Sequence, residues 1–148
     1  MAPLQLVVFP YLLLCSYVYL SHVCNGESIT DVITEYGPVR GTAVGSIVQF
    51  LSIPFAKPPV GELRWTMPQA PDSWTEPLNC TEEPPPCAAQ NGKGQSEDCL
   101  YLNVFAPAAC TASNRCAVLL WIHGGGYMTG SGNNNGTHLA GLDVVCHL

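Results

Sequence analysis

The sequence predicts an α/β protein in which small antiparallel strands lead into a central, mostly parallel sheet. Ala117 to Ile122 reads AVLLWI and is apolar throughout, which is typical of a strand covered on both faces in such a sheet. Residues 39–45 and 47–51 flank the dipeptide Gly45-Ser46, which predicts a pair of strands joined by a tight turn. Leu100 to Phe105, LYLNVF, alternates as a half-buried strand does.

Composition limits the chain to one domain and excludes two classes of protein. The 148 residues are 47% apolar and only 11% charged, a balance opposite to that of disordered chains. Five Lys and Arg against eleven Asp and Glu give a net charge of −6, with no basic cluster. We therefore expect no nucleic-acid partner. The sequence leaves the oligomeric state open.

Residues 1–26 predict a secretory signal peptide. They contain no charged side chain, and residues 4–23 form an apolar run interrupted by Pro10. Gly26 and Cys24 supply the small residues that cleavage after position 26 needs. A signal anchor and a buried helix are the alternatives, because Lys and Arg are missing near Met1. Cleavage would leave residues 27–148 as a secreted chain without a membrane attachment.

Cysteines and glycosylation sequons also suit an exported protein. Eight cysteines in 148 residues favour an oxidising compartment. Asn79 and Asn135 each begin an Asn-x-Thr sequon, and Asn135 is the better candidate because a cysteine occupies the middle of the other. Residues 54–86 contain so many prolines that we expect a long ordered surface loop with no regular element.

The glycine run after the apolar strand carries the chemistry. His123 is followed by Gly124, Gly125 and Gly126, so the backbone turns at a strand end without side chains in the way. Exposed N–H groups there suit an anion, such as the oxygen that gains charge in the transition state of acyl transfer. A plain flexible glycine turn is the alternative.

These residues carry a resemblance to a known family. Residues 119–132, LLWIHGGGYMTGSG, resemble the oxyanion loop of type-B carboxylesterases, the α/β-hydrolase family that includes the cholinesterases. Residues 96–107, SEDCLYLNVFAP, are similar to the second signature of that family. Residues 39–74 follow its opening order, so the resemblance extends from about Gly37 to Gly132.

The resemblance implies a fold and a function. The fold would be the amino-terminal portion of an α/β-hydrolase fold, and the full-length protein would hydrolyse small-molecule carboxylic esters without cofactor or metal. The N–H groups of Gly125 and Gly126 would be oxyanion-hole donors, with His123 and Gly124 shaping the loop. A half-exposed or packed histidine of no special role is the alternative for His123.

The resemblance also implies two links that hold this region together. Cys87 and Cys99 match the first disulfide of the family. Arg64 and Glu97 match a buried ion pair, for which we expect Arg64→Ala to cost several kcal/mol in the full-length protein. Two solvated charges are the alternative.

The remaining cysteines are interpreted from their spacing. Cys110 and Cys116 bracket a polar turn, which favours a local hairpin disulfide. Cys80 and Cys146 stay unassigned. No C-x-x-C pair is present, so we expect no metal site.

The catalytic serine pattern of the family is absent. No G-x-S-x-G occurs, and the resemblance puts the nucleophile, acid and base after the glycine run, beyond Leu148. We therefore expect a chain truncated before the nucleophile, inactive and poorly soluble by itself. A non-catalytic adhesion or recognition module, or an inactive truncated product, is the alternative to an ester hydrolase.

Two details concern specificity and geometry. Residues 88–98 contain no aromatic side chain, which disfavours a cholinesterase-like cation–π site and favours a general carboxylesterase. Ser52 stands where the family usually has glycine, with an unknown effect on the backbone.

Overall fold

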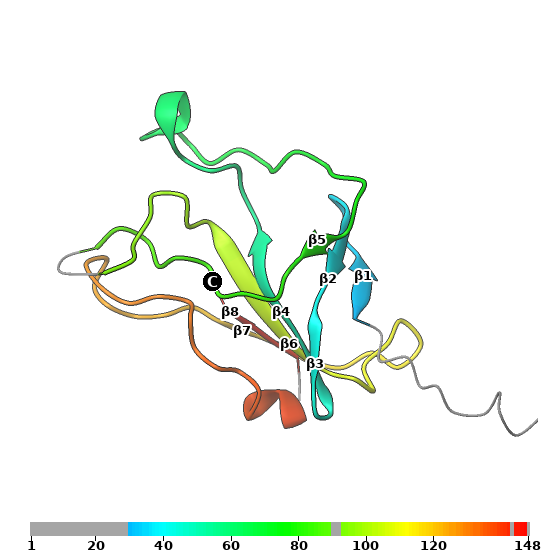
Figure 1. Cartoon of the computed structure of the whole chain (residues 1–148). Coiled ribbons are helices and arrows are strands. Elements are labelled where there is room, and N and C mark those ends of the chain that lie inside the picture. The colour runs from blue at the N-terminus through cyan, green and yellow to red at the C-terminus, as the bar shows by residue number, and fades with distance from the viewer. Residues whose placement is uncertain (1–29, 90–92, 143, 148) are drawn as a thin grey trace, which may run out of the picture.

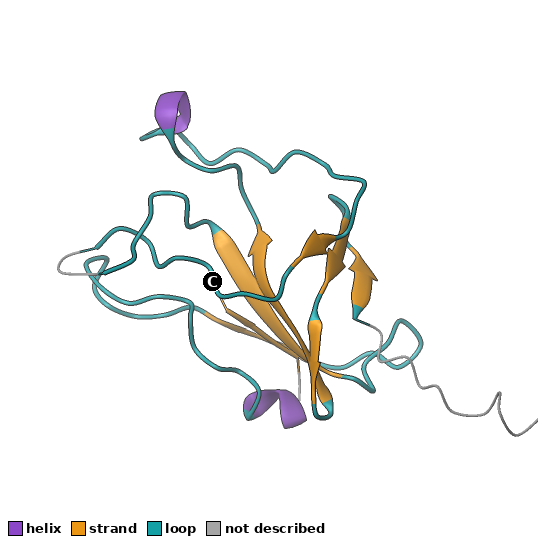
Figure 2. Cartoon of the chain, in the orientation of Figure 1, coloured by secondary structure: helices purple, strands orange, loops and turns teal. Residues whose placement is uncertain are grey.

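The computed structural model describes residues 30–89, 93–142 and 144–147, and for the last segment the backbone only. The chain forms two sheets joined by long loops, with two single-turn 3-10 helices (Figures 1 and 2). The expected α/β fold is seen here as its strand-rich portion. The smaller sheet has the order β1-β2-β5, formed by Asp31–Ile33, Pro38–Arg40 and Leu78–Asn79.

The larger sheet has the strand order β3-β4-β6-β8-β7. Its strands are β3 (Thr42–Val44), β4 (Ile47–Pro54), β6 (Tyr101–Pro107), β7 (Val118–Trp121) and β8 (Val144–His147). Neighbours are antiparallel from β3 to β8, whereas β8 and β7 are parallel. Antiparallel strands therefore lead into a parallel pair, as the sequence predicts.

The tight turn between β3 and β4 lies where the sequence predicts it. Val44 pairs with Ile47, and Gly45 between them has a φ of 62°. This left-handed backbone is unfavourable for residues with a Cβ atom, which explains the glycine. Residues 39–40 of the expected first strand belong instead to β2 in the smaller sheet.

The core lies on both faces of β4. Val48 and Phe50 pack with Val39 and Cys80 on one face, and Ile47 belongs to a second cluster. That second cluster also contains Leu51, Phe105 and Ala140. Because side chains alternate along a strand, a strand covered twice needs apolar residues at successive positions, and β4 has them.

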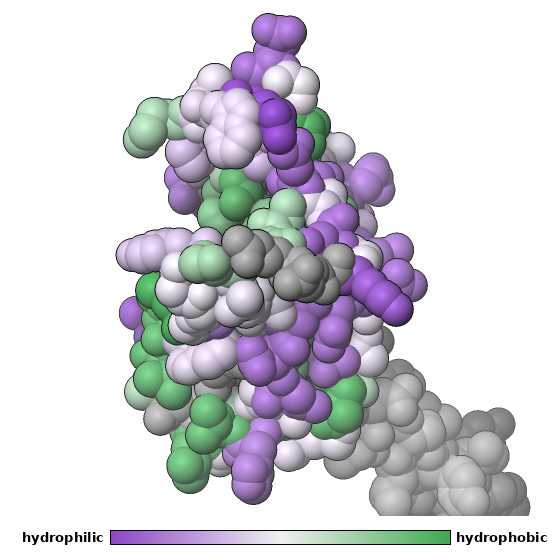
Figure 3. Space-filling model, turned by 90° about the vertical axis from the view of Figure 1, so that its left-hand side faces the viewer, coloured by the Kyte–Doolittle hydropathy of each residue, from purple (hydrophilic) through white to green (hydrophobic). Residues whose placement is uncertain are grey.

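The apolar strand β7 is exposed, contrary to the expectation that both its faces are covered. Its four residues have exposed fractions between 39% and 66%. It is the last strand in the order of the described sheet, and no described segment packs over it as the clusters on β4 do. Figure 3 shows hydrophobic residues gathered along the side of the molecule on which β7 lies.

The proline-rich segment is more regular than expected. It contains the 3-10 helix η1 (Gly61–Leu63) and strand β5. Cys80 follows β5 directly and holds this strand in place. Its N–H donates to the Arg40 carbonyl, and its carbonyl accepts from the Leu51 N–H. Backbone hydrogen bonds to two sheets thus impose a short strand despite the neighbouring prolines.

Candidate functional site

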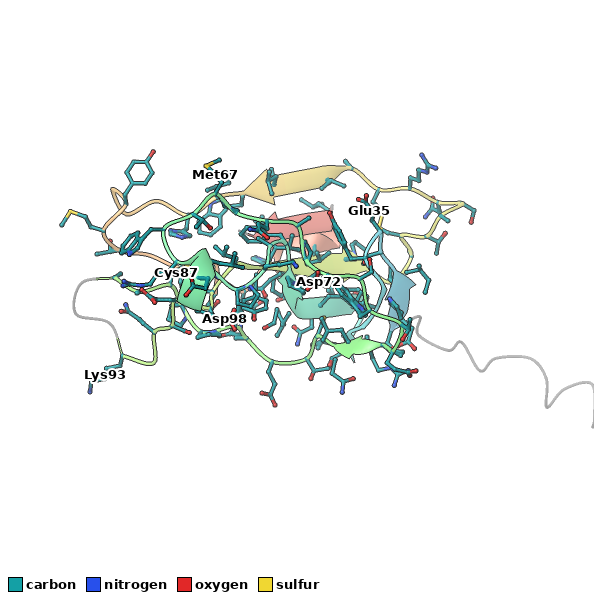
Figure 4. The ribbon with its side chains drawn as sticks, turned by 90° about the horizontal axis from the view of Figure 1, so that it is seen from above. Glu35, Met67, Asp72, Cys87, Lys93 and Asp98 are labelled. Carbon is teal, nitrogen blue, oxygen red and sulfur yellow. A yellow bond between two sulfur atoms is a disulfide. The ribbon has the colours of Figure 1, made fainter. Side chains whose placement is uncertain are left out.

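Three strand ends meet at one rim of the larger sheet. Asn103 of β6 pairs with His147 of β8, which pairs with Trp121 of β7, so these residues lie level across the sheet. β6 and β7 run in opposite directions, so the start of β6 lies beside the end of β7. Figure 4 shows Cys87 and Asp98 toward the end of the molecule to which β7 points.

The chain folds back on itself directly after β7, in a segment that we call the glycine bend (residues 123–130). The Gly125 carbonyl accepts hydrogen bonds from the N–H groups of Met128 and Thr129, at 3.1 and 3.2 Å. Gly125 has a φ of 133°, and a Cβ atom there would lie 1.9 Å from the Thr129 carbonyl oxygen. Glycine is therefore required at 125 by backbone contact as well as by backbone angle.

The amide groups of the glycine bend stay outside the sheet ladder. The register of β7 with β8 ends at Trp121. Neither the Gly125 nor the Gly126 N–H donates a hydrogen bond to another atom of residues 30–89, 93–142 or 144–147. Both glycines are exposed. Two neighbouring backbone donors are thus available to a ligand at this rim.

Tyr127 follows the glycines with an unusual backbone. Its φ is 61°, a left-handed value that costs a bulky residue about 1 kcal/mol or more. Its side chain is fully exposed. Left-handed backbone at both Gly126 and Tyr127 makes the bend tight, which is a recurrent property of ligand-binding loops.

His123 and Gly124 form the base of the bend. The His123 Nδ1 atom lies 2.8 Å from the Gly124 carbonyl oxygen, so Nδ1 carries the proton in this contact. A Cβ atom at Gly130 would lie 2.5 Å from the same Nδ1 and 2.4 Å from the Gly124 oxygen. Gly130, the first residue of the segment that we call the returning limb (residues 130–133), therefore packs directly on the histidine.

A pocket of about 220 Å³ lies beside the bend. Its lining combines the two cysteines Cys87 and Cys99, the start of β6, the two residues directly after β7, and residues 131–133. It includes His123, Asn103, Cys87 and Cys99, together with the apolar residues Phe55, Leu100 and Ile122. The residues of three motifs that are distant in sequence are thus brought to one cavity.

Asn103 is a residue of this pocket that the sequence analysis did not single out. It is 2% exposed. Among the described residues, it is the only polar or charged residue that is buried. Its Oδ1 accepts the Ser52 N–H at 3.0 Å, and its Nδ2 donates to the Gly132 carbonyl at 3.2 Å. The signal in the sequence that could have identified it is an amide side chain within the otherwise apolar strand LYLNVF.

Two disulfides pair the cysteines as expected. Cys87 and Cys99 are bonded, with their Cα atoms 5.1 Å apart, and their loop borders the pocket. Cys110 and Cys116 are bonded across the turn between β6 and β7. Cys80 is a free, fully buried thiol, and burial raises its pKa to about 11. The Cys146 side chain lies outside the described residues.

Arg64 and Glu97 are in contact, but their ion pair is not buried. The Arg64 Nε atom lies 2.6 Å from Glu97 Oε1, and the two side chains are 49% and 42% exposed. The Arg64 guanidinium also lies 4.7 Å from the centre of the Trp65 ring. Water screens such a half-exposed pair in this chain. The loss of several kcal/mol expected for Arg64→Ala in the full-length protein stays a prediction.

Tyr101 bonds to Asp98, a residue of the loop between Cys87 and Cys99. Its hydroxyl donates a hydrogen bond of 2.8 Å to the Asp98 carboxylate. Burial, together with this bond and the nearby negative charge, raises the pKa of Tyr101 to about 12. The phenol therefore stays neutral at physiological pH and acts as a donor.

The two sequons differ in their surroundings. Asn79 is exposed at the end of β5, but the next residue is the buried Cys80. Asn135 is exposed, and its Oδ1 accepts from the Thr137 N–H at 2.9 Å and from the Thr137 hydroxyl at 2.6 Å. His138 is exposed. The expected signal peptide and the His147 side chain lie outside the described residues.

A second, larger pocket lies away from the glycine bend. It measures about 650 Å³ and is lined by residues between Ser52 and Pro85, together with Tyr101. None of its lining residues belongs to residues 123–130. The smaller pocket is lined by His123 of the bend, although neither Gly125 nor Gly126 is among its lining residues, so it is the pocket nearer to the two free N–H groups.

The described part of the chain has neither a cluster of metal ligands nor a membrane-spanning helix. No group of three or more His, Cys, Asp or Glu side chains within residues 30–89, 93–142 and 144–147 could hold a metal ion. Within the same part of the chain, the helices are too short to span a bilayer.

Known proteins resemble this chain over most of its length. The medium-chain fatty acyl-CoA hydrolase precursor of Anas platyrhynchos is 38% identical over 139 residues, covering 78% of this chain and 25% of that protein. The para-nitrobenzyl esterase of Bacillus subtilis is 39% identical over 126 residues, covering 77% and 25%. The chain thus spans about a quarter of the length of these relatives.

Solved structures agree with these relatives. A para-nitrobenzyl esterase structure superposes with a TM-score of 0.74 at 41% identity, over 80% of this chain and 26% of that one. A carboxylesterase of Geobacillus stearothermophilus gives a TM-score of 0.73 at 39% identity, over 79% and 25%. The described strands are therefore a portion of an α/β-hydrolase fold. The sequence profile of the carboxylesterase family matches residues 28–146, and the chain belongs to this family.

Proposed function

We propose that this chain supplies the oxyanion-stabilising part of a carboxylic ester hydrolase. The N–H groups of Gly125 and Gly126 are two donors to the oxygen that gains charge when a nucleophile attacks the ester carbonyl. The serine nucleophile, its acid and its base are not provided by residues 1–148, which contain no G-x-S-x-G pattern.

One observation carries the proposal. The two N–H groups lie past the end of the β7 ladder, are exposed, and donate to no other atom of the described residues. Buried or paired amides would have to break existing bonds before they could bind an oxyanion. Amides that are already free need no such reorganisation, which is what makes electrostatic stabilisation effective.

The magnitude is sufficient for catalysis. Removing one oxyanion donor costs about 3 to 4 kcal/mol, or roughly a hundredfold to a thousandfold in kcat. Two donors from adjacent residues can therefore account for a large part of the rate enhancement. His123 shapes the bend in this proposal, because its Nδ1 proton is used in the contact with the Gly124 carbonyl.

The substrate class follows from the pocket and the relatives. The pocket beside the bend is small and partly lined by Phe55, Leu100 and Ile122, which suits a small or medium acyl or alcohol group. The relatives carry the names fatty acyl-CoA hydrolase, carboxylesterase and para-nitrobenzyl esterase, all of which describe acyl transfer to water. We extend that reaction class to the protein of which this chain forms part of the fold.

A chimeric enzyme tests the proposal. Residues 30–147 replace the matching quarter of the Bacillus subtilis para-nitrobenzyl esterase, which is 39% identical to this chain. If the glycine bend is a working oxyanion hole, the chimera hydrolyses para-nitrophenyl acetate with a kcat within about tenfold of the parent enzyme. A melting transition measured on the same preparation shows whether the chimera is folded.

The activity of the chimera distinguishes an enzyme part from a non-catalytic module. A folded chimera whose kcat is lower by about a thousandfold or more would reject the oxyanion role. It would favour the adhesion or recognition alternative for this chain. A chimera with Gly125→Val serves as control and should lose turnover, because a side chain at 125 collides with the Thr129 carbonyl.

The chain by itself is proposed to be inactive. It lacks the serine pattern, and the exposed β7 should make it prone to association. Turnover of an aryl ester by the purified 148-residue chain, abolished by a serine-directed organophosphate, would overturn this proposal.

Export and glycosylation are proposed as well. The uncharged apolar run in residues 1–26 supports a signal peptide, and the exposed Asn135 supports an occupied sequon. Expression in cultured mammalian cells should give a chain whose mass falls on treatment with a glycosidase specific for N-glycans. Asn135→Gln should remove that mass change, and Asn79→Gln should leave it. Unmodified chain recovered from the cytosol would contradict both points.

A further inference from the structure

We propose that Asn103 is a positioning residue that ties the glycine bend to the irregular part of β4. It contacts no proposed reacting atom and acts through the returning limb of the bend. Its catalytic meaning rests on the proposed oxyanion role, but the contact itself can be tested without any turnover.

The first half of the contact is on β4. The register of β4 with β6 shifts between Phe50 and Ile53, which leaves Ser52 out of the ladder with a φ of 63°. Its N–H would be unpaired there, but it donates to the Asn103 Oδ1 atom at 3.0 Å. The Asn103 side chain thus replaces a strand partner at the bulge.

The second half of the contact reaches the bend. Asn103 Nδ2 donates to the Gly132 carbonyl at 3.2 Å. Two residues earlier, Gly130 packs against the His123 ring and the Gly124 carbonyl so closely that a Cβ atom would collide with both. A shift of Gly132 is therefore transmitted to the residues immediately before the two proposed donors.

Burial makes the contact specific. Asn103 is 2% exposed, so an amide group that lost either partner would stay desolvated. The side chain offers one acceptor and one donor group in a fixed orientation, and each faces the matching backbone group. Aspartate has nearly the same shape but, when ionised, has no donor for the Gly132 carbonyl. When protonated, it regains one.

This difference gives a test in which one substitution works as a pH switch. Asn103→Asp keeps an acceptor for Ser52 and loses the donor for Gly132 above the pKa of the new carboxyl. The chain, expressed from its own first methionine in a mammalian secretory host, is examined by amide hydrogen exchange with mass spectrometry. In peptides covering residues 123–132, the Met128 and Thr129 amides report on the bend because they donate to the Gly125 carbonyl, whereas the Gly125 and Gly126 amides are already free. Peptides covering residues 47–51 report on β4.

We expect a local and pH-dependent effect. At pH 7 the bend peptides of Asn103→Asp should exchange about tenfold faster than in the wild type, the loss expected for one buried hydrogen bond. The β4 peptides should change less than the bend peptides. As the pH falls and the carboxyl becomes protonated, the ratio of variant to wild-type rates at the bend should return toward one.

Controls separate positioning from general stability. Asn114→Asp alters another side-chain amide that donates to a backbone carbonyl, that of Ala109 in the exposed turn after β6, and should leave the bend unchanged. Asn103→Ser, which is smaller and neutral, should speed exchange at the bend at every pH.

Two results would overturn the proposal. One is unchanged exchange of the bend in Asn103→Asp at pH 7. The other is an equal increase at bend and β4 that does not recover at low pH, which indicates a purely structural role. A failed chimera would reject the proposed oxyanion role but would not alter these exchange rates, so the two failures are distinguishable.

Discussion

Ser52 and Asn103 are joined by a hydrogen bond between a strand backbone and a side chain 51 residues away in sequence. The bond closes a bulge in β4, where Ser52 has a left-handed backbone. The Ser52 hydroxyl adds a second bond, of 2.7 Å, to the Glu82 carbonyl. A serine with a Cβ atom is therefore held in a conformation that glycine adopts more easily.

The left-handed backbone at Ser52 predicts that glycine is more stable than alanine at this position, the reverse of the usual order in strands. Ser52→Gly should be more stable than Ser52→Ala by about 1 kcal/mol, because alanine keeps the left-handed Cβ clash and glycine does not. Both variants lose the hydroxyl, so its bond to Glu82 cancels in the comparison. Urea unfolding of the two variants measures the difference. The ordinary order for strands, with alanine more stable, would contradict the observed φ.

The half-exposed Arg64 pair gives a prediction for this chain by itself. Arg64→Ala should lower the free energy of unfolding by about 1 kcal/mol, from an exposed ion pair and a contact with Trp65. Lys57→Ala, which breaks the pair with Asp72, is a matched control and should cost less than about 1 kcal/mol. Denaturant titrations of both variants check this. A loss above about 3 kcal/mol for Arg64 alone would mean that its pair is desolvated.

The two disulfides should contribute unequal amounts. Cys87 and Cys99 are separated by 12 positions and Cys110 and Cys116 by 6, and a longer closed loop removes more entropy from the unfolded chain. Replacing the first pair by serines should cost about 3 kcal/mol, and replacing the second pair about 2 kcal/mol. Thermal or urea unfolding of the two double variants measures both. Equal losses would argue against loop entropy as the source.

Tyr101 predicts a loss of stability at alkaline pH. Its pKa is raised from 10 to about 12 in the folded chain, so the folded state favours the protonated phenol. This contribution is fully present below pH 10 and is lost as the pH rises toward 12. Tyr101→Phe should therefore lose less stability between pH 9 and pH 11 than the wild type.

Cys80 also titrates in this alkaline range, but it is present in both proteins and cancels from the comparison. The stability of both is obtained from urea unfolding at each pH. Parallel pH profiles for the two proteins would show that Tyr101 ionises as freely in the folded state as in the unfolded one.

Local signals in the sequence predicted the features that depend on local chemistry. The Gly45-Ser46 turn, the strand at residues 101–107 and the Cys110–Cys116 disulfide all depend on neighbouring residues. The family resemblance added the Cys87–Cys99 disulfide and the contact of Arg64 with Glu97. The glycine bend lies where an apolar strand followed by glycines predicts it.

Features that depend on distant partners could not be read from the sequence. The exposure of β7 and of the Arg64 pair depends on which segments cover them, and composition does not encode coverage. Strand β5 forms in a proline-rich segment because Cys80 bonds to both Arg40 and Leu51. Asn103 looks like an ordinary strand residue until the bulge at Ser52 and the carbonyl of Gly132 are placed beside it.

The central claim is that the Gly126 N–H stabilises a developing oxyanion, and replacing that one group tests it most directly. In the chimeric para-nitrobenzyl esterase, Gly126 is replaced by glycolic acid, which exchanges the N–H for an oxygen and changes no side chain. The same exchange at Gly132 turns the Ser131 carbonyl, which accepts from Asn134 Nδ2 at 3.1 Å, into an ester carbonyl and so controls for the effect of a backbone ester. The account predicts a kcat lower by about a hundredfold to a thousandfold at 126, with KM little changed. A kcat within about threefold of the Gly132 control would contradict it.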